Sequence, residues 1–338
     1  MRLLVLGDFF YSYDFIADDI FIMGEYIKNH GLGVILNLEG AITRSNSEIK
    51  KRGEHLRQSP KTLEVLRILN VKGVSLSNNH IFDFGKEGLA ETIDALDEAG
   101  ILHCGAGLDI YEALKPMCLQ WGDYSYEFYG MTDFYEESIQ ASDINAGCGP
   151  IHNLQSTVSI KDGVMRVALI HSGFEYNSLP MPRNIKQYRT LLQKGFDAVV
   201  ASHPHVLQPW EIYKGKPITY SLGNFYFSEY RQEFHGKTIR GEEPGYCDIG
   251  MGIILGQPLE IIDIQYNHDT GESRFTNRRN MDSTLMYSAD FKYRLSCYKN
   301  RNNHNPILTG NEISDTLRLK TLDSAYFVYG QIKKLIHR

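Results

Sequence analysis

The sequence predicts an α/β fold, in which buried strands alternate with amphipathic helices. Short apolar runs that end abruptly in polar residues are typical of buried parallel strands, and segments with apolar residues at helical spacing lie between them. The polar residues that end these runs are acids, amides and histidines, which indicates a site along one edge of the sheet. The chain of 338 residues is long enough for one large domain with an appendage or for two ordinary domains.

The first half of the chain alternates strand and helix patterns. Apolar runs of strand character cover residues 3–6, 34–36 and 73–77. Helical spacing of apolar residues is found over 16–28, 62–69 and 88–99. Gly100 follows the last of these segments as a plausible C-cap.

The second half begins with strand runs over 164–170 and 196–201. The pattern then changes, and residues 218–225, 249–255 and 259–266 indicate antiparallel strands with glycine turns. The last stretch shows only weak helical spacing, over 313–322 and 324–335. We therefore expect a main domain over 1–270 and a small, partly helical C-terminal extension over 271–338.

The composition limits the function and the compartment. With 35 Lys and Arg against 41 Asp and Glu, the net charge is -6, so there is no electrostatic reason to expect nucleic-acid binding. The 5 cysteines include no C-x-x-C pair, which indicates thiols in a reducing compartment. The first apolar run meets an acid at Asp8 and no run could span a bilayer, so we expect a cytoplasmic protein, unless a leader or anchor has been removed.

The segment Ser202-His203-Pro204-His205 is the most informative short motif. In extended backbone, side chains two residues apart point to the same side, so His203 and His205 could offer two imidazoles to one place. Taken alone, the segment could equally be a polar turn. His171 directly follows a predicted strand and, alone, could be a surface imidazole.

Two acids also follow predicted strands. Asp8 could cap the helix that follows, and Glu39 could be a solvated loop acid. However, five predicted strands in succession are followed by potential metal ligands, and coincidence at every strand end is improbable. In chain order these ligands are Asp8, Glu39, Asn79 beside His80, His171, and the pair His203 and His205. Carboxylates, imidazoles and an amide suit Mn, Fe or Zn, and a paired site of such ions can activate a water.

This order of motifs resembles the calcineurin-like metallophosphoesterase superfamily, and more closely its CapA branch, the poly-γ-glutamate capsule biosynthesis proteins. The resemblance extends from Gly7 to about Phe227. It implies a four-layer α/β/β/α sandwich. The matching segments are Gly7-Asp8, Asn37-Leu38-Glu39-Gly40, Ser77-Asn78-Asn79-His80 with Asp83-Phe84-Gly85, His171-Ser172-Gly173-Phe174-Glu175-Tyr176, Ser202-His203-Pro204-His205 and Tyr220-Ser221-Leu222-Gly223-Asn224-Phe225.

The resemblance also implies roles for these residues. Asp8 and His205 would ligate a first divalent metal ion, and Glu39 would bridge it to a second. The ligands of the second ion would be Asn79, His171 and His203. His80 would protonate the leaving group and Asp83 would orient its imidazole, although His80 could also be a buried loop histidine.

One position departs from the superfamily pattern. Phe10 stands where the superfamily has a histidine, so the first metal position has lost a nitrogen ligand and is weaker, completed by water or empty. Further candidates for substrate binding are Glu175 and Asn224 in the branch motifs and the loop cations Arg57 and Arg183. Alternatively, Glu175 could form a cap or salt bridge, and Asn224 could be a turn residue. The two arginines could be ordinary surface cations.

The function expected from this resemblance is a metal-dependent hydrolase. It would cleave a phosphoester or an amide of an anionic small molecule or polymer in capsule or poly-γ-glutamate metabolism, with one or two Mn, Fe or Zn ions activating water. The alternative is a non-catalytic metal-binding partner of other capsule-synthesis proteins, which the loss of a ligand at Phe10 favours. A phosphatase with no capsule role is a third possibility.

Overall fold

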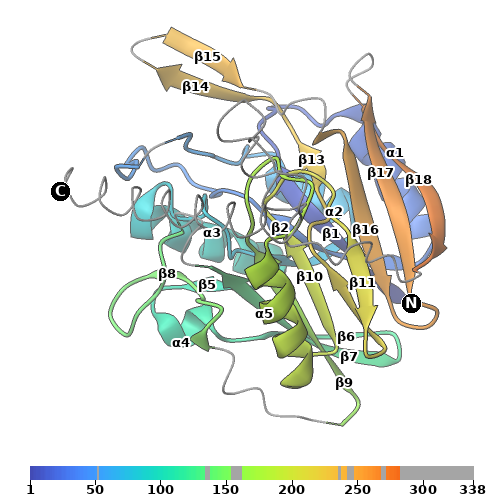
Figure 1. The fold of residues 1–338 in the computed structure, drawn as a ribbon. Helices are drawn as coiled ribbons and strands as arrows, with labels where there is room; N and C mark the ends of the chain where they lie inside the picture. The colour runs from blue at the N-terminus through green and yellow to red at the C-terminus, as the bar shows by residue number, and fades with distance from the viewer. Residues whose placement is uncertain are drawn as a thin grey trace, which may run out of the picture.

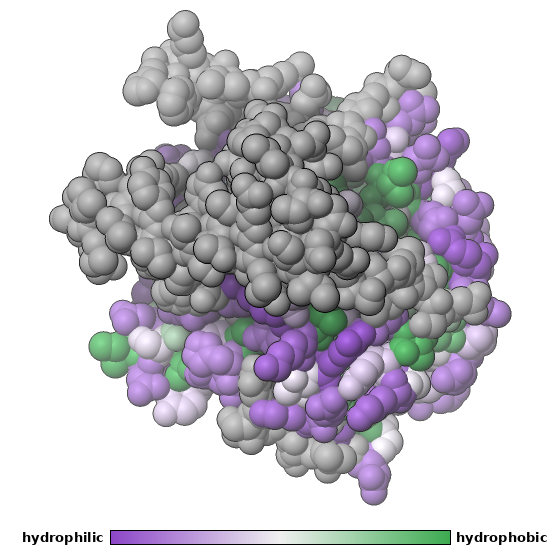
Figure 2. Space-filling view, viewed as in Figure 1, coloured by the Kyte–Doolittle hydropathy of each residue, from purple (hydrophilic) through white to green (hydrophobic). Residues whose placement is uncertain are grey.

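The computed structural model describes residues 1–51, 53–133, 138–153, 162–234, 237–241, 247–267 and 272–281. Within 230–246 it describes the backbone alone. Two large β-sheets lie face to face, and helices cover their outer faces (Figure 1). The surface seen in Figure 2 is mainly hydrophilic where it is described, with scattered apolar patches.

The first sheet has 8 strands and a parallel centre. The parallel strands are β1 (Arg2–Phe10), β2 (Leu32–Leu38), β3 (Val71–Ser75) and β4 (Leu102–Cys104). On the other side of β1 the sheet continues with antiparallel strands β16 (Ile249–Leu255), β17 (Glu260–Asn267) and β18 (Glu272–Asn280). The short strand β13 (Asn224–Phe227) pairs in parallel with the C-terminal end of β1, whereas β16 pairs with its N-terminal part.

The second sheet has 6 strands. Its parallel centre consists of β7 (Tyr124–Thr132), β9 (Val164–His171), β10 (Ala198–Ser202) and β12 (Lys216–Thr219). The antiparallel edge strands are β6 (Met117–Trp121) and β11 (Trp210–Tyr213). Two short pairs complete the described strands: β5 (Ala106–Gly107) with β8 (Gly147–Cys148), and the projecting hairpin of β14 (Tyr230–Phe234) and β15 (Lys237–Gly241) (Figure 1).

Three apolar clusters separate four layers. The outer face of the first sheet packs on α1 (Asp18–Asn29), α2 (Thr62–Ile68) and α3 (Gly85–Ala99). A middle cluster joins residues such as Val5 of the first sheet to Phe128 of the second. The third cluster packs the second sheet on α5 (Pro182–Gln193), with the short α4 (Ile110–Ala113) at its margin. The α/β/β/α sandwich predicted from the sequence is therefore confirmed.

Alternating side chains explain this layering. Leu4 and Leu6 of β1 face the helices, whereas Leu3 and Val5 face the other sheet, as expected for a strand whose successive side chains point to opposite faces. Since both faces are covered, β1 is apolar from Leu3 to Gly7, directly before Asp8. The acid thus enters a layer that is otherwise closed to water.

Most predicted elements lie where the sequence placed them, and Gly100 ends α3 with a left-handed φ of 67°. The prediction that 218–225 is an antiparallel strand is wrong in part. The chain leaves the second sheet after β12, turns at Gly223 with a φ of 68°, and enters the first sheet as β13, parallel to β1. A left-handed turn of this kind favours glycine.

The C-terminal region is described only in part. Strand β18 belongs to the first sheet and continues it past residue 270. The predicted helical segments 313–322 and 324–335 lie outside the described residues, as does Cys297. Cys104, Cys118, Cys148 and Cys247 are free thiols. Within the described part of the chain, no helix combines the length and the apolar character needed to cross a membrane.

Candidate metal centre

The polar strand ends of both sheets meet at one place. Asp8 lies within β1, Glu39 directly follows β2, His171 ends β9, and His203 directly follows β10. Parallel strands end at the same edge of their sheet, so the face-to-face packing of the two sheets brings these four side chains together. All four are buried, with exposed fractions of 0% for both acids.

Asp8 is held by donors from both sheets. Its Oδ1 accepts a hydrogen bond from Asn37 Nδ2 at 2.8 Å, and its Oδ2 accepts one from the backbone amide of His203 at 3.0 Å. A Cβ at Gly7 would collide with the carbonyl of Gly223, so the glycine before Asp8 lets β13 approach β1. Asp8 is therefore a strand residue, and the helix-cap alternative is wrong because α1 has Ala17 at its N-cap.

Glu39 faces two imidazoles. Its Oε1 lies 3.9 Å from His171 Nε2 and 3.8 Å from His205 Nε2. Gly40 follows with a φ of 90°, and a Cβ there would lie 2.6 Å from the carbonyl oxygen of Leu56. The tight exit from β2 thus requires glycine and turns Glu39 inward, so the solvated-acid alternative is wrong.

His205 is oriented by Asn224. The Nδ1 of His205 lies 2.9 Å from Asn224 Oδ1, an acceptor, so Nδ1 carries the hydrogen and Nε2 keeps its lone pair toward Glu39. Ligand atoms of Asp8, Glu39 and His205 lie within 4.8 Å of one another. These three residues form what we call the first half of the cluster.

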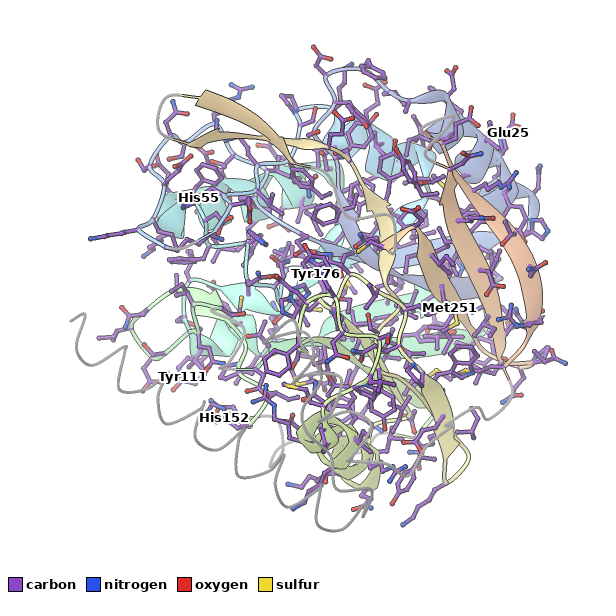
Figure 3. All side chains as sticks on the ribbon, turned by 45° about the horizontal axis from the view of Figure 1, so that its top comes forward. Glu25, His55, Tyr111, His152, Tyr176 and Met251 are labelled. Carbon is purple, nitrogen blue, oxygen red and sulfur yellow. The ribbon has the colours of Figure 1, made fainter. Side chains whose placement is uncertain are left out.

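An aromatic wall lies beside this first half. The Phe227 ring meets the His205 ring edge-on at a centroid distance of 5.1 Å, and Phe10 packs on Phe227 at 5.3 Å. Tyr176, near the centre of Figure 3, has its ring centroid 6.0 Å from that of His205. Phe10 thus contributes to packing at the position where the superfamily pattern has a ligand.

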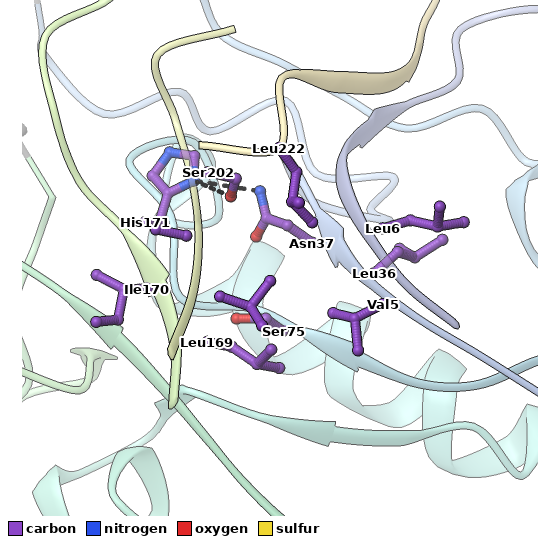
Figure 4. Close-up of a pocket in the computed structure, with 12 residues that line it drawn as sticks. Val5, Leu6, Leu36, Asn37, Ser75, Leu169, Ile170, His171, Ser202 and Leu222 are labelled. Atoms are coloured by element: carbon purple, nitrogen blue, oxygen red, sulfur yellow. Dashed lines mark hydrogen bonds between the residues drawn. The ribbon is translucent and has the colours of Figure 1, made fainter. Parts of the chain in front are cut away.

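The second half of the cluster consists of Asn79, His171 and His203. The Nε2 of His171 lies 2.8 Å from Asn79 Oδ1 and 3.0 Å from His203 Nδ1. On the other side of the ring, His171 Nδ1 contacts Asn37 Nδ2 at 3.3 Å and Ser202 Oγ at 3.4 Å, beside a cavity of about 10 Å³ (Figure 4). These contacts fix the ring so that Nε2 points at Glu39, Asn79 and His203.

The electrostatics favour an ionised Asp8 and neutral His171 and His203. Burial raises the pKa of Asp8, but hydrogen bonding and charge from His171, followed by His205 and the His203 amide, hold it well below its usual range. Burial lowers the pKa of His171, and its contact with Asp8 opposes this only in part. Burial, reinforced by His171, lowers the pKa of His203 further. These are the protonation states in which such groups bind a cation.

The H-x-H segment has unusual backbone conformations. His203 has a φ of 101° and His205 a φ of 57°, in the region that disfavours residues with a Cβ. Tyr176, which donates its backbone amide to Pro204, has a φ of 61°. Strain of this kind is found at functional sites, where surrounding structure imposes it, and here it directs both imidazoles inward. Both histidines are buried, so the segment is not a solvent-exposed polar turn.

His80 and Asp83 form a pair next to the cluster. The Nδ1 of His80 lies 2.8 Å from Asp83 Oδ2, which also accepts a hydrogen bond from the Leu56 amide at 2.8 Å. Burial lowers the pKa of His80 to about 4 against the opposing effect of Asp83. The imidazole is therefore neutral near neutral pH, with Nδ1 donating to Asp83.

The four residues predicted to bind substrate occupy different surroundings in the structure. Arg57 donates to the carbonyl of Ser45 at 2.6 Å and stacks over Phe84, so it secures its own loop. Arg183 lies 3.7 Å from the carboxylate of Asp133, and Glu175 is exposed. The structure thus brings Asn224 to the cluster, as a partner of His205.

Three residues near the centre were missed as functional positions. Asn37 donates to Asp8, and Asn78 donates to the Leu38 carbonyl at 2.8 Å while accepting from the His80 amide at 3.1 Å. Both occur in the motifs quoted above, and their position next to candidate ligands was the available signal. Lys51, which contacts His80 and Asp83, lies in a loop with no motif.

The donor set fits a divalent metal ion. Two buried carboxylates and neutral imidazoles, with an amide oxygen beside them, are the ligands that Mn, Fe and Zn accept. Outer partners orient His171 and His205, as metal-binding histidines require. The residues that could hold an ion are Asp8, Glu39, Asn79, His171, His203 and His205.

Comparison with known proteins agrees with the motifs. The family described as bacterial capsule synthesis protein PGA_cap matches residues 22–229. The PGA biosynthesis protein CapA of Bacillus subtilis (strain 168) is 30% identical over 63% of this chain and 58% of its own. The capsule biosynthesis protein CapA of Bacillus anthracis is 28% identical over 55% of this chain and 47% of its own length. A probable polyglutamine synthesis accessory protein of Mycobacterium tuberculosis is 28% identical over 56% of this chain and 54% of its own length.

The chain thus spans about half the length of these relatives. Among solved structures, the sulfate thiohydrolase SoxB of Thermus thermophilus has a TM-score of 0.39 at 12% identity, over 84% of this chain and 56% of that one. The protein TT1561, also of Thermus thermophilus, has a TM-score of 0.35 at 11% identity, over 71% and 97%. Similarity at this level does not indicate a shared function.

Proposed function

This chain belongs to the bacterial capsule synthesis protein PGA_cap family, and from that premise we propose that it is a metal-dependent hydrolase in capsule or poly-γ-glutamate metabolism. The observation that carries the proposal is the buried convergence of Asp8, Glu39 and His205 within 4.8 Å, beside His171 and His203. A bound divalent ion would supply an activated water and stabilise negative charge on the reacting group.

The protein's own residues supply position and proton transfer. Asp8, Glu39, His171, His203 and His205 are buried, so charges at the reaction centre interact strongly. In the form that has taken a proton from water, His80 donates its Nε2 proton to the departing oxygen or nitrogen and returns to the neutral imidazole, while Asp83 keeps the Nδ1 proton in place. The substrate class that suits this centre is an anionic phosphoester or an amide of an acidic polymer.

A non-catalytic role in a capsule-synthesis complex is the second candidate. It is favoured by Phe10, which packs on Phe227 where a ligand is expected, and by the description of the mycobacterial relative as an accessory protein. A partner of this kind would keep the fold and one ion, and it would bind other capsule-synthesis proteins. It would turn over no substrate.

Turnover by the metal-reconstituted protein separates the two candidates. We would assay a phosphodiester, a phosphomonoester and a γ-glutamyl peptide with wild type, His80→Gln and the exposed control His152→Ala. The hydrolase proposal predicts turnover of at least one probe, lost by roughly 100-fold or more in His80→Gln and kept in the control. No turnover with metal bound would favour the accessory role.

The pH dependence tests the part assigned to His80. Because its pKa is lowered to about 4, the protonated form becomes scarcer at each step above that pH. A proton-donor role therefore predicts that the His80-dependent part of kcat/KM falls as pH rises from about 5 to 8. A His80-dependent rate that instead rises with pH would contradict this role.

A further inference from the structure

The loop of residues 44–57, between β2 and α2, is rich in cations. In a chain whose net charge is -6, this segment of the sequence has more basic than acidic residues. The basic residues are Arg44, Lys50, Lys51, Arg52 and Arg57, and the acids are Glu48 and Glu54. A local excess of cations on an acidic protein favours the binding of anions.

The 44–57 loop contacts the His80–Asp83 pair directly. The Nζ of Lys51 forms an ion pair with Asp83 Oδ1 and lies 3.1 Å from His80 Nδ1. The backbone amide of Leu56, near the other end of the loop, donates to Asp83 Oδ2 at 2.8 Å. The loop therefore borders the candidate metal centre on the side of His80.

Hydrogen bonds hold this loop in one conformation. Ser45 Oγ donates to Glu87 of α3 at 2.8 Å, and the Ile49 amide donates to the carbonyl of Asp83 at 2.9 Å. The Nε2 of His55, which is labelled in Figure 3, lies 2.8 Å from the carbonyl oxygen of Ile49. A ligand of the loop would thus bind to cations that are already positioned, which lowers the entropic cost of binding.

Two of the loop cations are available to a ligand. Arg57 is engaged by the carbonyl of Ser45, at 2.6 Å. Lys50 is exposed and, within the residues that the structure describes, forms no hydrogen bond or ion pair. The ammonium of Lys51 has three donors, of which Asp83 accepts one, and the side chain is 14% exposed. Lys50 and Lys51 can therefore both donate to an anion.

We propose that Lys50 and Lys51 bind an anionic group on the leaving side of the substrate. The side follows from position, because Lys51 lies beside His80, the residue that protonates the leaving group. A carboxylate and a phosphate share the chemistry that two ammonium groups recognise. The assignment of the leaving side rests on the proposed hydrolase function, whereas the binding of an anion by the two lysines does not.

The binding test uses calorimetry on the metal-reconstituted full chain with γ-linked triglutamate. Lys51→Met should weaken its binding at least about fivefold, because a charge-assisted hydrogen bond is lost. Lys50→Met should weaken it about threefold, as expected for an exposed ion pair. Lys51→Arg keeps the charge and should bind nearly as wild type does. The exposed Lys115→Met, in the segment after α4, is the control and should match wild type.

The kinetic test compares substrates that differ only in the leaving fragment, which carries a carboxylate, a phosphate or a neutral carboxamide. Wild type should prefer an anionic fragment, and Lys51→Met should reduce that preference at least about fivefold, mainly through KM. The preferred anion identifies the source as a carboxylate or a phosphate. Because Lys51 also contacts Asp83, the preference and not the absolute rate is the measure.

Two results would overturn the proposal. One is triglutamate binding that is unchanged in Lys50→Met and Lys51→Met. The other is an equal loss of rate with anionic and neutral fragments in Lys51→Met, which would show that Lys51 only supports Asp83. Metal content equal to wild type in each variant confirms that the centre is intact. The expected loss of binding in a protein that hydrolyses no probe would defeat the hydrolase function and the leaving-side assignment, and would leave the anion site standing.

Discussion

The two halves of the candidate metal cluster both face Glu39 and differ in how their nitrogen atoms are held. In the first half, His205 is the single histidine, fixed by Asn224 and flanked by the aromatic ring of Phe227. In the second half, His171 and His203 already approach each other to 3.0 Å with Asn79 beside them. The second half therefore offers two imidazole ligands where the first half offers one, and we expect it to bind a divalent ion more tightly.

This difference has a structural origin. His171 ends β9 and His203 directly follows β10; these strands are neighbours in one sheet, so the separation of the two histidines is fixed by strand pairing. The first half combines β1 and β2 of the first sheet with His205, and its geometry depends on the crossover that brings β13 to β1. Tight binding in the first half thus depends on packing between sheets, which small changes can disturb.

The largest expected effect comes from the shared acid. Glu39→Gln removes a carboxylate that faces Nε2 of both His171 and His205, so metal content should fall to less than about a tenth of wild type. The measurement is elemental analysis after dialysis. The exposed Glu25→Gln on α1 (labelled in Figure 3) is the control and should keep its metal. Full metal content in Glu39→Gln would show that the halves do not share a ligand.

Single histidines should separate the halves. His171→Ala should remove the tighter-bound ion, and His205→Ala the weaker one, because each loses a nitrogen from one half only. Metal titration followed by calorimetry would record this as loss of the first or the second binding phase. Equal effects of the two variants on both phases would contradict the assignment.

Asn224 tests how the first half is oriented. Asn224→Leu removes the acceptor for His205 Nδ1 and should weaken metal binding in the first half by roughly 10–100-fold. Asn224→Asp keeps an acceptor and should stay within a few-fold of wild type. If Asn224 instead contacts substrate, both variants would keep their metal affinity and raise KM.

The smallest effect is expected from Phe10→His. The ring of Phe10 packs on Phe227, so a histidine there must repack before it can reach the first half, and we expect a gain in metal affinity below about tenfold. Isothermal titration of the weaker phase measures it. A large gain would show that Phe10 already points at the ion, and a loss would show that the aromatic wall supports His205.

The sequence predicted the parts of the site that follow strands. Asp8, Glu39, His171 and His203 each lie at or just after a strand, and a parallel sheet brings strand ends together whatever the loops do. The four layers were implied by the family resemblance that these motifs carry. For these features, local pattern and tertiary structure agree.

The features that were not predicted depend on contacts distant in sequence. The parallel pairing of β13 requires the turn at Gly223 and the absence of a Cβ at Gly7, more than 200 residues apart. Only that pairing places Asn224 beside His205 and Asp8. Lys51 reaches Asp83 from a loop without periodicity, so no sequence pattern indicated it.

Elemental analysis for Mn, Fe and Zn tests the central claim most directly. The protein would be purified without chelator as wild type, as the double variant His203→Ala with Asn79→Ala, and as the control His152→Ala. We predict at least about one ion per chain in wild type and control, and loss of the tighter-bound ion in the double variant. Wild type that holds no metal even after reconstitution, or a double variant that binds as much as wild type, would contradict a metal centre at these residues.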